Sequence, residues 1–125
     1  MESKKILIIE DDPDQILLYR EAFRLADFPV DAVDNGREGV EKIKKDKPDI
    51  VILDILMDDL SGVNVLQLVR ENSETKNIPV LVLTNLVRED IERQVRKLGV
   101  EDYIIKTSVI PVEVVERVKK ILGIR

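Results

Sequence analysis

The sequence contains no cysteine and no histidine, and its aromatic residues amount to 3% of 125 positions. These absences exclude disulfides, thiol nucleophiles, imidazole bases and the usual zinc sites. A bound metal must therefore be held by oxygen atoms, which indicates magnesium, manganese or calcium. Any chemistry that the chain performs must use carboxylates, hydroxyls and lysine.

Long apolar runs and an excess of basic residues are also missing. No apolar run approaches the roughly 20 residues that span a bilayer, and the net charge of -5 argues against nonspecific binding to nucleic acid. The segment from Met1 to Lys5 lacks the design of a signal peptide, so we expect a cytoplasmic protein. No linker interrupts the chain, which predicts one domain over residues 1–125 and no output domain.

The sequence does contain a regular alternation of strand and helix patterns. Short runs, most of them rich in β-branched residues, predict strands at 5–9, 29–33, 49–54, 78–83 and 102–106. Apolar residues at helical spacing predict helices at 14–25, 36–45, 61–69, 91–98 and 114–122. This order predicts an α/β fold in which a five-stranded parallel sheet carries helices on both faces.

The first of these helices has four apolar residues in a row at 16–19, so one of them must face outward. We expect Leu17 to be that residue. Leu18, Tyr19 and Phe23 are expected on the buried face.

Polar side chains stand where four of the predicted strands end. They are Glu10 with Asp11, then Asp54, Thr84 and Lys106. Because the carboxyl ends of parallel strands meet at one edge of a sheet, we expect these groups to lie together. Each residue alone has an ordinary structural explanation, but the whole set at four strand ends indicates a functional site.

Three crowded carboxylates repel one another, by about 4 kcal/mol per pair at about 4 Å and an effective dielectric constant near 20. A hard divalent cation relieves this repulsion, and Lys106 supplies a second positive charge. Thr84 supplies a hydroxyl donor. This set suits the in-line transfer of a phosphoryl group to the carboxylate of Asp54, with cation and lysine neutralising the equatorial oxygens.

The whole chain resembles the receiver domain of two-component response regulators. Ile8-Ile9-Glu10-Asp11-Asp12 resembles the acidic pocket of that family, and Leu53-Asp54-Ile55-Leu56-Met57 resembles its phosphorylation loop. The resemblance implies the flavodoxin-like (βα)5 fold with strand order 2-1-3-4-5.

The same resemblance assigns roles to single residues. Asp54 would accept the phosphoryl group, and Mg2+, or alternatively Mn2+, would be held by Asp11, Asp54, the carbonyl of Leu56 and, through water, Glu10. Lys106 matches the family's lysine, Thr84 its switch hydroxyl and Tyr103 its switch aromatic, which is expected to swing inward on activation.

The function implied is that of a stand-alone, chemotaxis-type response regulator. A sensor histidine kinase or a phosphotransfer protein would donate the phosphoryl group, docking on the first helix around Leu17 and on the loop after Lys106. The surface of the fourth helix, fifth strand and fifth helix would then control a downstream protein, with Val87 and Ile110 as contacts. A dimer formed on activation stays open, and neither nucleic acid nor membrane is expected as a partner. Apart from its own phosphorylation and dephosphorylation, the chain is not expected to be an enzyme.

Several positions depart from the family's pattern. Asp58 replaces a proline, and Thr107 replaces the proline that usually follows the lysine through a cis bond. A cis bond before a non-proline residue costs about 2.5–4 kcal/mol, so we expect the Lys106–Thr107 peptide to be trans with a rearranged loop, or cis and strained. Asn85 is expected to narrow access to the phosphoryl group. Leu56 and Leu86 are apolar where polar residues help water attack, which predicts slow self-dephosphorylation.

The sequence also bears on three other functions. The departures at Asp58 and Thr107 keep a binding adaptor that works without phosphorylation as the alternative. A phosphatase with an aspartyl nucleophile usually has a second acid two residues later, where this chain has Leu56. Nucleotide binding is disfavoured because Asp11-Asp12-Pro13 lacks glycines and a phosphate-friendly charge.

Overall fold

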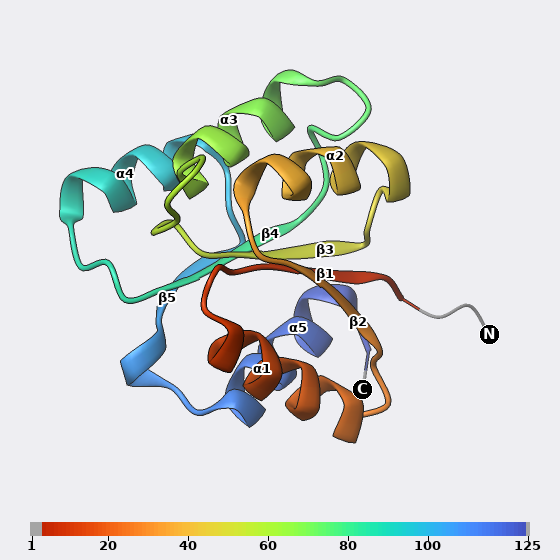
Figure 1. Ribbon diagram of the computed structural model, residues 1–125. Helices are drawn as coiled ribbons and strands as arrows, with labels where there is room; N and C mark the ends of the chain where they lie inside the picture. The colour runs from red at the N-terminus through yellow and green to blue at the C-terminus, as the bar shows by residue number, and fades with distance from the viewer. Residues whose placement is uncertain (1–3, 125) are drawn as a thin grey trace.

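Strands and helices alternate along the whole of the chain that the computed structural model describes, residues 4–124 (Figure 1). Most element boundaries lie within two residues of the sequence-based expectation. The elements are β1 (Ile6–Ile9), α1 (Pro13–Leu25), β2 (Val30–Val33), α2 (Gly36–Asp46), β3 (Ile50–Leu53), α3 (Gly62–Glu71), β4 (Val80–Thr84), α4 (Glu89–Leu98), β5 (Asp102–Ile105), the 3-10 turn η1 (Lys106–Ser108) and α5 (Pro111–Leu122).

The five strands form one sheet in the order β2-β1-β3-β4-β5, and all neighbours are parallel, as predicted. The register of the strands sets which polar residues lie side by side at the carboxyl edge of the sheet. Ile9 is paired with Leu53, so Glu10 and Asp54 are the next residues on two adjacent strands. Thr84 is paired with Ile105, which places Lys106 just beyond the same edge.

Helices cover both faces of the sheet. Figure 1 shows α1 and α5 on one face and α2, α3 and α4 on the other. Successive residues of a strand point to opposite faces. Leu7 and Ile9 of β1 therefore join the core under α2, α3 and α4, whereas Ile6 and Ile8 join the core under α1 and α5. Every residue of β1, β3 and β4 is buried, which explains why these strands read as unbroken apolar runs.

Helix α1 shows one error in the predicted burial. Leu17 is 70% exposed, as expected, but Leu18 is 47% exposed rather than buried. Tyr19 and Phe23, four residues apart, face the sheet and fill the space beneath it. Leu18 lies about 100° around the helix from Tyr19, which turns it toward the flank. The first helix therefore exposes two adjacent leucines.

No helix within residues 4–124 has the length and apolar character needed to cross a membrane.

Candidate functional site

Lys106 joins the two buried carboxylates at the carboxyl edge of the sheet. Its ammonium nitrogen Nζ donates a hydrogen bond of 2.9 Å to Oδ2 of Asp54 and another to Oε2 of Glu10. The side chains are only 9% exposed for Lys106 and 7% exposed for each carboxylate. Because the three residues follow β5, β3 and β1, the sheet itself sets their spacing.

Burial dominates the electrostatics of Glu10. The pKa of Glu10 is raised from 4.5 to about 7: burial raises it most and the charge of Asp54 also raises it, whereas the hydrogen bond and the charge of Lys106 lower it. Burial also disfavours the charged form of Lys106, but the hydrogen bonds to Glu10 and Asp54, together with their charges, raise the pKa of Lys106 overall. Two carboxylates thus share one ammonium, and a second cation would be electrostatically favoured there.

The backbone around Asp54 is held from two directions. The amide of Leu56 donates a hydrogen bond of 3.0 Å to Oδ1 of Asp54, so both carboxylate oxygens have partners. On the other side, Gly62 packs against the loop so closely that a Cβ atom there would lie 2.4 Å from the carbonyl oxygen of Asp54. A side chain at position 62 would therefore displace the backbone that carries Asp54.

The residues predicted to hold a metal supply suitable donor atoms. Glu10 and Asp54 lie together, and Asp11 follows Glu10 with its side chain partly exposed. Within residues 4–124, however, no three Asp or Glu side chains lie close enough together to hold a metal ion in their present positions. The donors are oxygen atoms and their charge exceeds that of Lys106, which fits a hard cation such as Mg2+. The ligand set of Glu10, Asp11, Asp54 and the Leu56 carbonyl stays a prediction.

Thr84 and Tyr103 are connected through a residue between β4 and α4. Thr84 is fully buried, and its hydroxyl accepts a hydrogen bond of 3.3 Å from the amide of Leu86. The hydroxyl of Tyr103 donates a bond of 2.8 Å to the carbonyl of the same Leu86. Tyr103 is only 7% exposed, so the aromatic ring that was expected to swing inward already lies inside in this structure.

The loop after Lys106 adopts the first of the two expected forms. Residues 4–124 contain no cis peptide bond, so the Lys106–Thr107 peptide is trans. β5 ends at Ile105, one residue earlier than predicted, and Lys106 begins the turn η1. Asn85 is exposed beside the site, and Leu56 is 49% exposed.

Asp59 has a role that the sequence analysis missed. Its two carboxylate oxygens accept hydrogen bonds of 2.9 Å from the amide of Gly36 and 3.1 Å from the amide of Arg37, at the start of α2. These bonds, with that from Gly36 foremost, lower the pKa of Asp59. Asn35 is the N-cap of the same helix, because its side chain accepts from the amide of Glu38; it also donates to the carboxylate of Glu38. Sequence spacing reveals only this second cap, because Asp59 lies more than 20 residues further along the chain.

Comparison with known proteins agrees with this architecture. The family model described as the response regulator receiver domain matches residues 6–119. The polar-differentiation response regulator DivK of Brucella anthropi is 28% identical over 120 residues, covering 96% of this chain and 97% of that protein.

Solved structures show the same similarity. A response regulator from Chloroflexus aurantiacus superimposes with a TM-score of 0.87 at 30% identity, covering 98% of this chain and 99% of that one. A CheY-like receiver domain from Methanospirillum hungatei gives a TM-score of 0.90 over 98% of this chain and 95% of that one, where 21% identity shows likeness of fold alone. Receiver domains are signalling modules that take phosphoryl groups from kinases and act on downstream targets, rather than enzymes that turn over an external substrate. The chain belongs to the family of response regulator receiver domains of two-component signalling.

Proposed function

We propose that Asp54 accepts a phosphoryl group from a phosphohistidine of a sensor histidine kinase or a phosphotransfer protein. The observation that carries this proposal is the buried cluster in which Lys106 bonds to both Asp54 and Glu10 at the carboxyl edge of the sheet. The carboxylate of Asp54 in that cluster is fixed in orientation and lies close to a positive charge.

The transfer uses groups that the fold has already oriented. A carboxylate oxygen of Asp54 forms a bond to phosphorus while the bond from phosphorus to the donor's imidazole nitrogen breaks. The ammonium of Lys106, which contacts Asp54 Oδ2, stabilises the negative charge on the phosphoryl oxygens. Glu10, Asp11, Asp54 and the carbonyl of Leu56 would hold Mg2+, which supplies further positive charge when bound.

Phosphorylation then changes a surface through the connection at Leu86. Thr84 and Tyr103 bond to the amide and the carbonyl of this one residue. A new anion on Asp54 can accept a hydrogen bond from the hydroxyl of Thr84. Movement of Thr84 toward the anion then shifts the segment that leads into α4. Val87, 76% exposed, follows Leu86, and Ile110, 58% exposed, precedes α5; these two residues are the contacts that we propose for a downstream protein.

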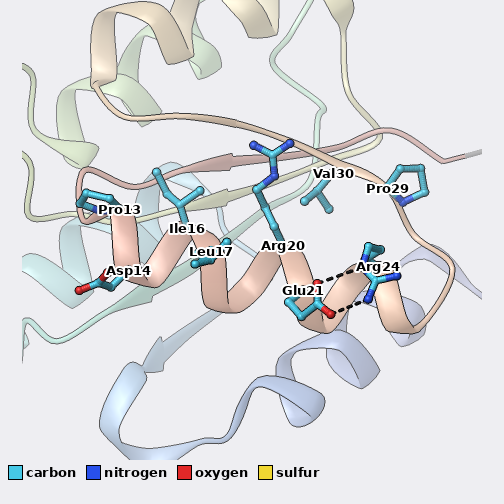
Figure 2. A pocket seen from close by; sticks show the side chains of 9 residues that line it. All are labelled: Pro13, Asp14, Ile16, Leu17, Arg20, Glu21, Arg24, Pro29 and Val30. Carbon is cyan, nitrogen blue, oxygen red and sulfur yellow. Dashed lines mark hydrogen bonds and ion pairs between the residues drawn. The ribbon is translucent and has the colours of Figure 1, made fainter.

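We propose that the phosphodonor protein docks along α1. Leu17 lies on a groove of about 630 Å3 between α1 and the start of β2 (Figure 2). Figure 2 shows the side chain of Arg20 extending from α1 toward the strand that carries Val30, while Glu21 is paired with Arg24 further along the helix. An exposed leucine beside arginines suits a partner helix that carries apolar and acidic residues.

Loss of the phosphoryl group is proposed to be slow. Leu56, half exposed at the mouth of the site, and Leu86 offer no polar group that positions an attacking water molecule. A lifetime on the order of seconds, measured after removal of the phosphodonor, contradicts this proposal.

The test is intact-protein mass spectrometry after incubation with Mg2+ and acetyl phosphate, for the wild type and Asp54→Asn. One added phosphoryl group on the wild type alone supports the proposed function. If neither protein gains mass although Mg2+ binding is confirmed, the adaptor that works without phosphorylation becomes the better description. Cytoplasmic localisation, like the choice of partner and a dimer on activation, belongs to the proposal and is tested in cells.

A further inference from the structure

The loop between β3 and α3, residues 54–61, is tied to a helix that contributes nothing else to the candidate site. The carboxylate of Asp59 accepts hydrogen bonds from Gly36 and Arg37, the first two residues of α2. These partners lie more than 20 residues from Asp59 along the chain, so the bonds join two separate elements. The same loop carries Leu56, whose amide bonds to Asp54.

The contact between the loop and α2 is also sterically tight. A Cβ atom on Gly36 would lie 2.6 Å from the carbonyl oxygen of Leu60 and 2.8 Å from its Cβ atom. The absence of a side chain at position 36 therefore lets the loop backbone reach the helix. The hydrogen bonds that Asp59 accepts and the close packing of Leu60 hold these two neighbouring residues against the same turn of α2.

The ends of the loop are fixed by other means. The amide of Gly62 donates a hydrogen bond of 3.0 Å to the carbonyl of Ile55, which closes the loop at its base. Between these two residues the chain runs through an arc in which Leu56, Asp58 and Asp59 all have exposed side chains. The two bonds of Asp59 hold that arc against the body of the protein.

Helix α2 already has a cap of its own. The side chain of Asn35 accepts from the amide of Glu38, as an ordinary N-cap residue does. Asp59, which is not part of α2, accepts hydrogen bonds from two further amides of that helix. Its carboxylate is exposed and screened by solvent, so we expect these bonds to add little to the free energy of unfolding. Their main effect is to fix the position of the loop.

We propose that Asp59 is a positioning residue, which anchors the loop of residues 54–61 on α2 and thereby holds the backbone of Leu56 beside Asp54. Its role in phosphoryl transfer rests on the proposed function, whereas the anchoring itself does not. Displacement of a group at a reacting centre by about 1 Å can lower a rate by roughly 100-fold, so a lost anchor has a measurable effect on the transfer.

The experiment compares Asp59→Ala, Asp59→Asn and the matched control Asn35→Ala. Both alanine variants remove a cap from the start of α2, but only the first also releases the loop. In EDTA, amide hydrogen exchange followed by NMR reports on the Leu56 amide. In Asp59→Ala we expect that amide to exchange at least about tenfold faster, and in Asn35→Ala within about twofold of the wild type, after normalising to the β3 amides.

The second readout is the rate of phosphorylation by acetyl phosphate. We expect the saturating rate to fall about tenfold in Asp59→Ala, to be nearly unchanged in Asn35→Ala and to recover in part in Asp59→Asn, which keeps one acceptor oxygen. Equal changes in the two alanine variants, for the Leu56 amide and for the rate, overturn the proposal and leave Asp59 as a simple helix cap. If the wild type takes up no phosphoryl group, the proposed function fails, and hydrogen exchange still decides whether Asp59 anchors the loop.

Discussion

Lys106→Met keeps most of the side-chain volume and removes the ammonium group that bonds to both Glu10 and Asp54. Each carboxylate side chain is only 7% exposed, so neither regains much hydration when its partner is lost. Removing one partner of a buried ion pair typically costs about 3–5 kcal/mol. We expect a loss of that size in the free energy of unfolding at pH 8 in the presence of EDTA.

The loss must shrink as the pH falls, because Glu10 can take up a proton. Its pKa is raised from 4.5 to about 7 in the folded protein, so between these values the folded state binds more protons than the unfolded state. Protonation therefore favours the folded state as the pH falls from about 7 toward about 4.5. Without Lys106 the hydrogen bond that lowers the pKa of Glu10 is gone, and the buried carboxylate is neutralised at a still higher pH.

The assay is urea unfolding followed by far-ultraviolet circular dichroism at pH 8 and pH 5.5, for the wild type, Lys106→Met, Glu10→Gln and the double variant. On the Glu10→Gln background only one buried charge is left unpaired by the loss of Lys106, so we expect a coupling energy of about 1–3 kcal/mol. Equal costs of Lys106→Met on both backgrounds and at both pH values would refute the reasoning. They would mean that the cost of losing Lys106 does not depend on the charge of Glu10.

Three other variants test parts of the same framework. Arg70 donates four hydrogen bonds to three backbone carbonyls, so Arg70→Lys should lower the free energy of unfolding by roughly 2 kcal/mol, whereas Arg93→Lys, at an exposed position, should change urea unfolding little. Tyr103→Phe removes the bond of 2.8 Å to the Leu86 carbonyl and should cost about 1 kcal/mol in the same assay; an unchanged midpoint contradicts that bond. Gly62→Ala should cost about 1–3 kcal/mol and slow phosphorylation by acetyl phosphate, because its new methyl group meets the phosphorylation loop; wild-type values for both would show that the loop moves aside freely.

The fold and the central cluster could be predicted because each depends on a local pattern. Strands buried on both faces need unbroken apolar runs, and parallel pairing brings their carboxyl ends to one edge. Glu10, Asp54 and Lys106 therefore meet in the structure as their positions in the sequence predicted. The prediction that Leu18 is buried was wrong, because a run of four apolar residues does not reveal which of them the sheet covers.

Asp59 could not be recognised in this way, since its role depends on a contact between separate elements. Asp58 and Asp59 are adjacent, exposed and chemically identical, and nothing in the local sequence distinguishes them. Only the packing of α2 against the loop, with Gly36 at the closest approach, turns one of the two carboxylates toward free backbone amides. Functional residues that directly follow a predicted strand can thus be found from the sequence. Residues that hold such groups in place from a neighbouring element require the three-dimensional arrangement, and substitutions at these positions should alter rates while the acceptor and the lysine stay intact.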